Sequence, residues 1–503
     1  MQINRPQFLI VLLLMFVFLI SCQNHKETTR PNILLLMSDN HSWNHLGCYG
    51  DPMVQTPNID RIAKQGVKFT QAYCAAPSCS PARAGMLTGQ DIWRLEEGAN
   101  LHGTLPSKFP LYTDLLQKSG YSVGCQGKGW GPGNVKESGR EFNHGGKQYQ
   151  SFTEFLESNT NSNPWCFWFS SRNPHRPYGV GSGEASGMDK SQVVVPSYLP
   201  DNDAVRGDIC DYYHDIQKFD DEVGEILTTL KETGQANNTI IVICSDNGWQ
   251  MPRGLANLYD FGTRIPMILS WKNKITADKK VDDFVNMNDL APTFLEIAGL
   301  EIPSNMTAKS LTNILFSQKE GRIEKDRDFV VTAVERHALC RLDGKGYPAR
   351  AIRTDDFLYI RNFHPERWPA GDPPLYGDVD AHMLHYPCPT KMHVLLNEKN
   401  PDEQGFFERA FAKRPTEELY DVRTDPDQLN NIADKKDYQE IKKELSNRLI
   451  GYLKKTNDPR VTGGEIIWDK AKYYATGDFK PRPNQEAIDL LDLKKEYNYF
   501  PEN

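Results

Sequence analysis

The stretch "NILLLMSDN" (Asn32–Asn40) is a continuous apolar run that ends in polar residues, and "TIIVICSDNG" (Thr239–Gly248) repeats this pattern. Runs that are apolar on both faces are typical of central strands in a parallel sheet. Two helical patterns lie between them: "TPNIDRIAKQG", and an amphipathic segment from Ile209 to Gly234. Strands that alternate with helices predict a large α/β domain with a central, mostly parallel sheet flanked by helices.

The pattern changes after about residue 315. The segments "RDFVVTAVERH", "ARAIRTDDFLYIRNF" and "EELYDVRTDPD" favour strands of an antiparallel sheet joined by turns, and "DYQEIKKELSNRLIGYLKKTND" favours an amphipathic helix. A chain of 503 residues is also too long for one compact core. We therefore predict a main domain over residues 31–325 and a smaller C-terminal α+β subdomain over residues 326–503, with the boundary somewhere in 315–395.

The N-terminus has the pattern of an export signal. An apolar run over residues 8–20 follows Arg5 and is short for a membrane span. The run ends in "LISC", which resembles a bacterial lipobox, where the chain is cleaved and Cys22 is lipidated; a plain signal peptide is the alternative. We predict a lipoprotein signal peptide over 1–21, a tether over 22–30 and an exported bacterial lipoprotein, periplasmic or at the cell surface, whose lipid anchor holds it to the membrane.

Charge and cysteine content exclude several classes of protein. The net charge is −8 and no basic block stands out, so nucleic acid is not an expected partner. An acidic protein that binds an anionic substrate must use local cations or a metal. Without Cys22, nine of the ten cysteines remain, with no CxxC pair, which argues against a disulfide framework or a zinc ribbon. At least one thiol is therefore unpaired, and Cys79 is the candidate.

Both predicted strands end in the triplet "SDN", which supplies Asp39, Asn40, Asp246 and Asn247. Ligands collect beyond the carboxyl ends of the strands in open α/β sheets, so these four side chains are expected to converge. Two carboxylates and two amide oxygens suit calcium or magnesium better than zinc. The alternative is that they cap the loops that follow the strands.

Cys79 lies in "PSCSPARAGMLTG" (Pro77–Gly89), at the start of a predicted helix and four residues before Arg83. A thiol at a helix N-terminus beside an arginine is expected to ionise easily and to be reactive. Pro81 fixes the approach to the helix, and Arg83 is able to make a bidentate contact with a tetrahedral oxyanion. A buried structural cysteine is the alternative.

The run "CSPAR", continued as "AGMLTG", resembles the signature of the sulfatase family, which has an alkaline-phosphatase-like fold. In that family a maturing enzyme oxidises the cysteine to formylglycine. The segments "RPNILLLMSDN", "SDNGWQMPRGLANLYDFGTRIPMIL" and "ELYDVRTDPDQLNNIAD" follow the family's order from Pro31 to about residue 435. Within this match, "GKGWGPG", "NPHRPY", "NLYDFGTRIP" and "RWPAGDP" are most similar to the heparan N-sulfatase (sulfamidase) branch and its bacterial relatives.

The resemblance implies a role for each matching residue, and makes residues 31–325 the catalytic domain. Cys79, as formylglycine hydrate, supplies the hydroxyl that attacks sulfur. Arg83 holds the formylglycine and the oxygens beside the metal, Lys128 contacts the sulfate and His175 protonates the leaving group. One Ca²⁺ ion is held by the modified Cys79 together with Asp39, Asn40, Asp246 and Asn247.

The sequence departs from the family pattern at three positions. Asn40 replaces the usual second aspartate, which removes one negative charge from the cation site. Trp130 stands where a histidine is usual, and Leu255 where a lysine or arginine is usual. Candidate substrate-binding residues are Trp130, which either stacks on a sugar or packs in the core, together with Arg253, which lies beside Leu255, and Glu335 and His337 at a strand end.

These patterns predict a carbohydrate sulfatase. The expected substrates are sulfate esters or sulfamates of glucosamine or N-acetylglucosamine-type sugars in host glycans such as heparan sulfate or mucin. One alternative is a phosphatase or phosphodiesterase of the same superfamily, which uses a threonine or serine nucleophile and two zinc ions held by histidines. Another is a degenerate sulfatase that only binds glycan as a lipoprotein.

Overall fold

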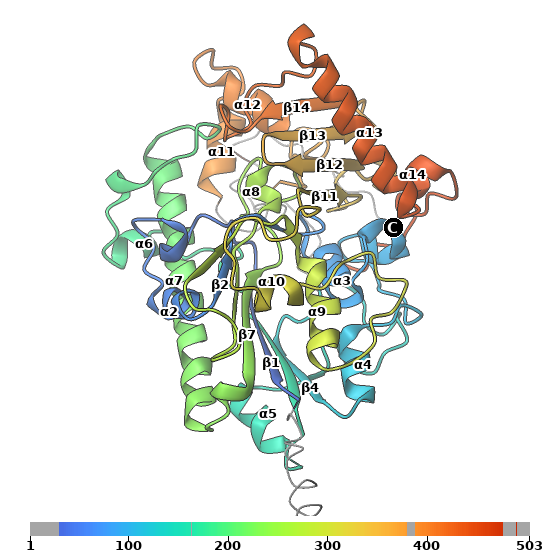
Figure 1. Ribbon diagram of the computed structural model, residues 1–503. Helices are drawn as coiled ribbons and strands as arrows, with labels where there is room; N and C mark the ends of the chain where they lie inside the picture. Colours follow the sequence, from blue (N-terminus) through green and yellow to red (C-terminus); the bar gives the residue numbers. More distant parts are fainter. Residues whose placement is uncertain (1–29, 162, 380–387, 476–488, 490–503) are drawn as a thin grey trace, which may run out of the picture. The chain divides into compact units, whose positions relative to one another are not determined.

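Strand β1 (Asn32–Ser38) is buried along its whole length at the centre of an eight-stranded sheet. The computed structural model describes residues 30–161, 163–379, 388–475 and 489 (Figure 1). The chain from Pro31 onward is one compact unit. The predicted signal peptide, Cys22 and nearly all of the tether lie outside the described residues.

The large sheet has the order β5-β4-β6-β1-β7-β8-β2-β9. Neighbouring strands are parallel except where β8 runs antiparallel to β7 and β2. The predicted central, mostly parallel sheet is therefore confirmed. The other strands of this sheet are β2 (Val67–Phe69), β4 (Ser122–Gly127), β5 (Lys147–Gln148), β6 (Trp165–Ser170), β7 (Thr239–Ser245), β8 (Met267–Ser270) and β9 (Lys279–Val281).

Helices cover both faces of this sheet, which explains why β1 is apolar at every position (Figure 1). Ile33, Leu35 and Met37 face one layer, and Leu34 and Leu36 face the other, because successive side chains of a strand alternate between its faces. The first layer contains α3 (Cys79–Thr88), α4 (Tyr112–Lys118), α9 (Leu290–Ile297) and α10 (Thr312–Phe316). The second contains α2 (Pro57–Lys64), α5 (Phe152–Ser158) and α7 (Asp203–Glu232).

Helix α7 begins upstream of the apolar pattern that predicted it. The periodicity starts at Ile209, whereas the helix starts at Asp203, because the side chain of Asn202 accepts a hydrogen bond from the backbone N–H of Val205. This cap stabilises a first turn that carries little apolar signal.

A separate four-stranded antiparallel sheet, in the order β11-β12-β13-β14, follows in the chain. It confirms the predicted antiparallel sheet, and Leu445, Leu449 and Leu453 of α13 lie in its hydrophobic core. The same core includes Ile92 and Trp93 of the first part of the chain. The division at residue 326 stays a prediction. The elements are β11 (Phe329–Val334), β12 (Ala349–Thr354), β13 (Phe357–Asn362), β14 (Glu417–Asp421), α11 (Pro389–Leu396), α12 (Gln404–Phe411), α13 (Gln439–Lys455) and α14 (Pro459–Thr462).

The remaining elements are short. Strands β3 (Ala72–Tyr73) and β10 (Val285–Asn286) pair in parallel, and α6 (Ser182–Ala185) and α8 (Asp260–Thr263) are single turns. In the parts of the chain that the structure describes, no helix combines the length and the apolar character that crossing a membrane requires.

Candidate active site

Four neighbouring parallel strands, β4, β6, β1 and β7, end at one edge of the large sheet. Asp39 and Asn40 follow β1, Lys128 follows β4, and Asp246 follows β7. The loop after β6 leads to His175. Because the carboxyl ends of parallel strands share an edge, residues far apart in the sequence meet there.

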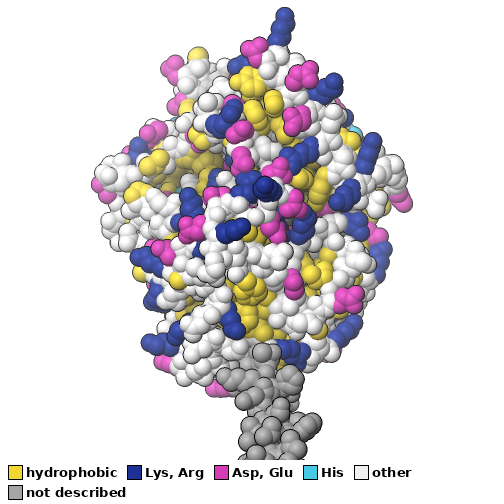
Figure 2. Space-filling model, viewed as in Figure 1, with side chains coloured by type: hydrophobic (Ala, Val, Ile, Leu, Met, Phe, Trp, Pro, Cys, Tyr) yellow, Lys and Arg dark blue, Asp and Glu magenta, His cyan; other side chains and the backbone are white. Residues whose placement is uncertain are grey.

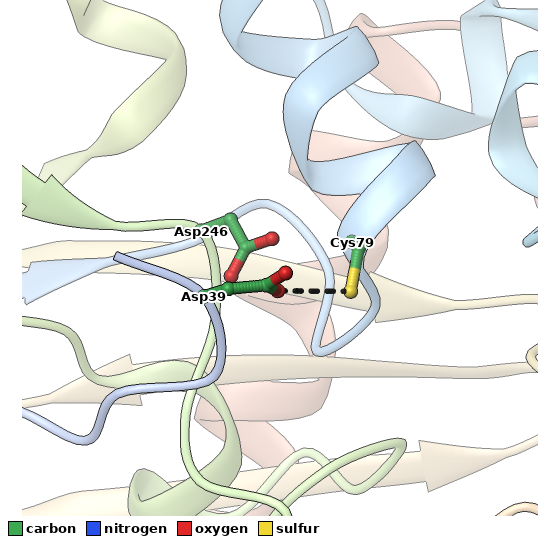
Figure 3. A group of neighbouring side chains, drawn as sticks. All are labelled: Asp39, Cys79 and Asp246. Carbon is green, nitrogen blue, oxygen red and sulfur yellow. Dashed lines mark hydrogen bonds between the residues drawn. The ribbon is translucent and has the colours of Figure 1, made fainter. Parts of the chain in front are cut away.

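Helix α3 supplies Cys79 to this edge. Three residues, Asp39, Cys79 and Asp246, each offer one atom that could bind a metal. These three atoms lie within 4.8 Å of one another, and all three residues are buried. Figure 3 shows Cys79 at the first turn of α3 with its sulfur toward Asp39, while Asp246 lies beside Asp39. The backbone N–H of Asn40 donates to Asp246 Oδ1 at 3.1 Å, which joins the two strand ends.

The two amide side chains complete an oxygen-rich cluster. Asn247 Nδ2 donates to Asn40 Oδ1 at 2.6 Å and to the carbonyl of Gly248 at 2.9 Å. The other amide atom of Asn247, Oδ1, is buried without a hydrogen-bond partner. Two buried carboxylates and amide oxygens, one of them without a hydrogen-bond partner, are the donors that a hard divalent cation prefers, so these residues fit the cation that the sequence predicts.

Arg83 is completely buried behind the carboxylates. Its Nε donates to Asp246 Oδ2 at 2.8 Å, and its Nη2 lies 3.8 Å from Asp39 Oδ1. Its Nη1 donates to the hydroxyl of Ser170 and to the carbonyl of Gly129. Nε and Nη1 are engaged by these protein groups, and through them the guanidinium neutralises and orients the carboxylates, whereas Nη2 is buried without a hydrogen-bond partner in the described part of the chain. The contact between Arg83 and an oxyanion stays a prediction.

Lys128 is the cation of this cluster that reaches solvent. Its Nζ donates to Asp39 Oδ2 at 2.6 Å, and its side chain is 16% exposed. Burial opposes ionisation of Asp39, but the positive charges of Lys128 and Arg83 outweigh it and lower the pKa of that carboxyl. Burial and the charge of Asp39 raise the pKa of Asp246. A divalent cation would relieve this like-charge pair.

The thiol of Cys79 is a hydrogen-bond donor in this environment. Its Sγ lies 3.5 Å from Asp39 Oδ1 and 3.7 Å from Asn40 Oδ1. Burial is the main cause that raises the pKa of the thiol well above its usual value, and the nearby carboxylates add to it. The expectation of an easily ionised thiol is therefore wrong, because burial and negative charge outweigh the helix N-terminus and the cations.

His175 lies half-buried in the loop after β6. Its Nδ1 is hydrogen-bonded to the carbonyl of Arg176. Since a carbonyl only accepts, Nδ1 carries the proton of the neutral ring. Burial and the positive charge of Lys128 lower the pKa of His175 to about 3. The ring is therefore neutral near pH 7 before any anion enters the site.

Trp130 belongs to the hydrophobic core. It is 2% exposed, its Nε1 donates to the carbonyl of Ser80 at 3.2 Å, and its ring packs on His144 with centroids 4.3 Å apart. A sugar cannot stack on a face that the protein already covers. The structure thus supports the packing alternative, and the substrate-binding assignment of Trp130 is wrong.

Two further substrate candidates are engaged elsewhere. The guanidinium of Arg253 stacks 3.8 Å from the ring centroid of Tyr259 and donates to the carbonyl of Arg409. Glu335 forms ion pairs of 2.6 Å with Arg350 and with Arg460. Both assignments are wrong, because these partners already engage the two side chains, which are 2% exposed.

His337 lies closer to the cluster. It is 3% exposed, and its Nδ1 is hydrogen-bonded to the hydroxyl of Ser78 at 2.8 Å, directly before Cys79. Burial lowers the pKa of His337 to about 4. His337 therefore links the end of β11 to the start of α3, and its contact with a sugar stays a prediction.

Sequence reasoning missed two residues that support the cluster. Ser170, the last residue of β6, accepts a hydrogen bond from Arg83, and Gln250 accepts one from Asn40 Nδ2 at 3.1 Å. Asn40 could have pointed to such a partner: an amide in place of a carboxylate brings an N–H group that needs a hydrogen-bond acceptor nearby, and Gln250 is that acceptor.

The fold thus brings a cysteine-bearing helix to a buried carboxylate pair at the carboxyl edge of a mostly parallel sheet. The chain belongs to the sulfatase family of sulfuric ester hydrolases: the family model described as Sulfatase matches residues 31–300. A second model, described as the C-terminal part of N-sulphoglucosamine sulphohydrolase, matches residues 253–366.

Known proteins resemble the chain over most of its length. It is 27% identical to an ulvan-active sulfatase of Formosa agariphila, over 85% of this chain and 81% of that protein. It is 26% identical to human N-sulphoglucosamine sulphohydrolase, over 88% of this chain and 93% of that protein. A structure solved in complex with its substrate, D-glucosamine-2-N,6-O-disulfate, aligns with a TM-score of 0.64 and 21% identity, over 87% of this chain and all of that one, and so shares the fold.

Proposed function

We propose that this protein is a carbohydrate sulfatase that releases sulfate from glucosamine or N-acetylglucosamine-type sugars, with Cys79 matured to formylglycine. One observation carries the proposal: Cys79 lies within 4.8 Å of the paired carboxylates Asp39 and Asp246, beside Lys128 and Arg83. The buried thiol has a raised pKa and is a poor nucleophile as it stands, so the proposed nucleophile is the modified side chain and not the thiol.

The proposed roles follow from position. Asp39, Asn40, Asp246 and Asn247 would hold a divalent cation, for which we propose Ca²⁺. When bound, such a cation withdraws charge from sulfate oxygens, and the hydrated aldehyde at position 79 supplies the nucleophilic hydroxyl. Arg83 keeps the carboxylates in place from behind. Lys128, ion-paired with Asp39 yet partly exposed, is the residue that we assign to a sulfate oxygen.

His175 is assigned to the leaving group. Its ring is neutral in the free enzyme because burial and Lys128 lower its pKa to about 3. Burial is the larger cause of this shift, and an anionic sulfate beside Lys128 would offset the second cause and raise the pKa of His175. We propose that the ring carries a proton when substrate is bound. Nδ1 is held by the carbonyl of Arg176, which leaves Nε2 as the atom that transfers this proton.

The substrate class rests on the relatives. The C-terminal model and the human relative both bear the name N-sulphoglucosamine sulphohydrolase, and the solved structure contains a sulfated glucosamine. The ulvan-active relative has similar identity and covers a similar share of the chain, so ulvan is the competing substrate. Among natural polymers we propose the host glycans heparan sulfate and mucin.

The two-zinc phosphatase is disfavoured by the same cluster. Within the described residues, the group of metal-type ligands consists of two aspartates and Cys79 and contains no histidine. His41, the histidine that follows Asn40, is hydrogen-bonded to Ser38 and to the carbonyl of His45. Oxygen donors without imidazole suit Ca²⁺ or Mg²⁺ rather than zinc.

The test is a screen of matured enzyme for sulfate release. The substrates are glucosamine and N-acetylglucosamine sulfated at single positions, the corresponding galactose sugars, ulvan and a phosphate monoester. We expect release from a glucosamine-type sugar, and none from the Cys79→Ala variant at an unchanged melting temperature. Hydrolysis of the phosphate ester alone, or equal activity in Cys79→Ala, would contradict the proposal; release from ulvan or a galactose sugar alone would contradict the substrate class.

A further inference from the structure

Gln250 lies in the loop after β7, completely buried between two other loops of the site. Its Oε1 accepts a hydrogen bond from Asn40 Nδ2 at 3.1 Å and another from the backbone N–H of Arg176 at 3.2 Å. Gln250 therefore joins the loop after β1 to the loop after β6, which carries His175.

These contacts determine how both amides are turned. A backbone N–H can only donate, so the Gln250 atom that faces Arg176 must be the oxygen. Because Gln250 presents its oxygen, the atom of Asn40 that faces it must be a donor, which is Nδ2. The oxygen of Asn40 must then point to the opposite side, where Asn247 Nδ2 and Cys79 Sγ lie 2.6 and 3.7 Å from it.

The fixed backbone of Arg176 makes this arrangement rigid. Its guanidinium forms two hydrogen bonds of 2.7 Å to Asp208, and both residues are buried. Gln250 thus accepts from an N–H group that a buried ion pair holds in position. An amide without such a partner turns over at little cost, and would then present N–H groups instead of an oxygen to a cation.

We propose that Gln250 is a positioning residue that aims the oxygen of Asn40 at the cation site, and that residues 40 and 250 act as a matched pair. The inference rests on the proposed cation site. An aspartate at position 40 would place an acceptor 3.1 Å from Gln250 Oε1, where the two oxygens repel. Gln250 thereby makes asparagine, with one negative charge fewer, the suitable ligand in this chain.

The test is a double-mutant cycle read as Ca²⁺ affinity, by calorimetry on metal-stripped protein. Loss of an outer partner of a metal ligand costs about 10–100-fold in metal affinity, and we expect a loss of this size for Gln250→Leu. Gln250→Glu keeps both accepted hydrogen bonds and adds a negative charge near the cation, so it should show none of the loss in Ca²⁺ affinity expected for Gln250→Leu. Gln90→Leu is the matched control, since Gln90 is equally buried and lies beyond the far end of α3.

The loss of Ca²⁺ affinity caused by Gln250→Leu should disappear or reverse in the Asn40→Asp background. There Gln250→Leu removes the facing oxygen, so affinity should rise or stay equal, and Asn40→Asp alone should gain nothing from its added charge. If Gln250→Leu does not fold, the Gln250→Glu and Asn40→Asp variants still test the pair.

Three results would overturn the inference while leaving the cation site intact: an unchanged affinity in Gln250→Leu, an equal loss in both backgrounds, or markedly tighter binding by Asn40→Asp alone. Wild-type protein that binds no Ca²⁺ would overturn the cation site and the inference together.

Discussion

Asp39 is the residue on which the other groups of the site converge. Lys128 Nζ, Arg83 Nη2 and Cys79 Sγ all approach its two oxygens. The positive charges of Lys128 and Arg83 keep the carboxyl of Asp39 ionised, although burial alone would favour its neutral form. An ionised, oriented Asp39 is able to share its charge with a bound cation, whereas a protonated one is not.

Replacing Lys128 with methionine should affect substrate and cation in opposite directions. The variant loses the proposed sulfate contact, and removing such a contact costs about 10²–10³ in turnover. The same change removes a positive charge 2.6 Å from Asp39, so Ca²⁺ should bind more tightly. Sulfate release and calorimetry measure the two effects. Lys136→Met, at an exposed lysine, is the control, and weaker Ca²⁺ binding in Lys128→Met would contradict the assignment.

The apolar runs of two strands led to the prediction that Asp39 and Asp246 converge at this edge, whereas Lys128 and Arg83 were given their roles by the resemblance to the sulfatase family. Sequence alone could not predict which candidate residues are already engaged. Trp130, Arg253 and Glu335 are covered by Ser80, Arg409 and Arg460, which come from other segments of the chain. The raised pKa of Cys79 has the same origin, since burial depends on tertiary packing.

At the scale of elements, α7 packs aromatic side chains against the loop after β1. His45 of that loop lies between Tyr212, Tyr213 and Trp249, with ring centroids 4.9 to 5.4 Å away. Its Nδ1 is 3.2 Å from the hydroxyl of Tyr212. The apolar periodicity predicted that this face of α7 is buried, but gave no sign that a histidine would be buried against it.

Burial lowers the pKa of His45 to about 3 from an ordinary value of 6.5. Between these two pKa values the imidazole is protonated in the unfolded chain but not in the folded chain. The free energy of unfolding is therefore unaffected by His45 above pH 6.5 and decreases as the pH falls below it. His45→Gln, which cannot titrate, should remove about 1.4 kcal/mol per pH unit from the slope of the unfolding free energy in this window.

Urea unfolding from pH 4.5 to 7.5 measures this slope. The control is His364→Gln, at a histidine that is partly exposed and hydrogen-bonded to Glu366. Equal slopes in wild type and His45→Gln would show that His45 does not contribute to the pH dependence of folding.

At the scale of the whole molecule, charge is mixed on the surface. In Figure 2, basic and acidic side chains intermingle around small apolar patches on the face shown. The net charge of −8 would not attract a sulfated polymer. Binding is therefore expected to depend on the local cations of the site and on the metal.

Removing the cation should destabilise the fold, since burial and the charge of Asp39 then oppose the ionisation of Asp246. A ligand that binds only the folded state adds about 2.7 kcal/mol at one hundred times its dissociation constant. We expect a higher melting temperature in Ca²⁺ than in EDTA, and no such difference in Asp246→Asn. An equal Ca²⁺ effect in that variant would place the cation elsewhere.

Membrane attachment is expected to depend on Cys22, outside the described residues. The Cys22→Ser variant should move from the membrane fraction to the aqueous phase on detergent partitioning, while sulfate release per molecule stays the same. Retention of the variant in the membrane fraction would contradict a lipid anchor at this position. The prediction of the fold did not depend on this segment, because the first strand, β1, begins at Asn32, beyond the tether.

The central claim is that activity resides in a modified Cys79. The most direct measurement compares sulfate release with the fraction of aldehyde at position 79, read from the mass of the tryptic peptide spanning residues 69–83, in preparations matured to different extents. Activity should rise in proportion to the aldehyde fraction and extrapolate to zero without it. Full activity in protein that retains the thiol would contradict the account.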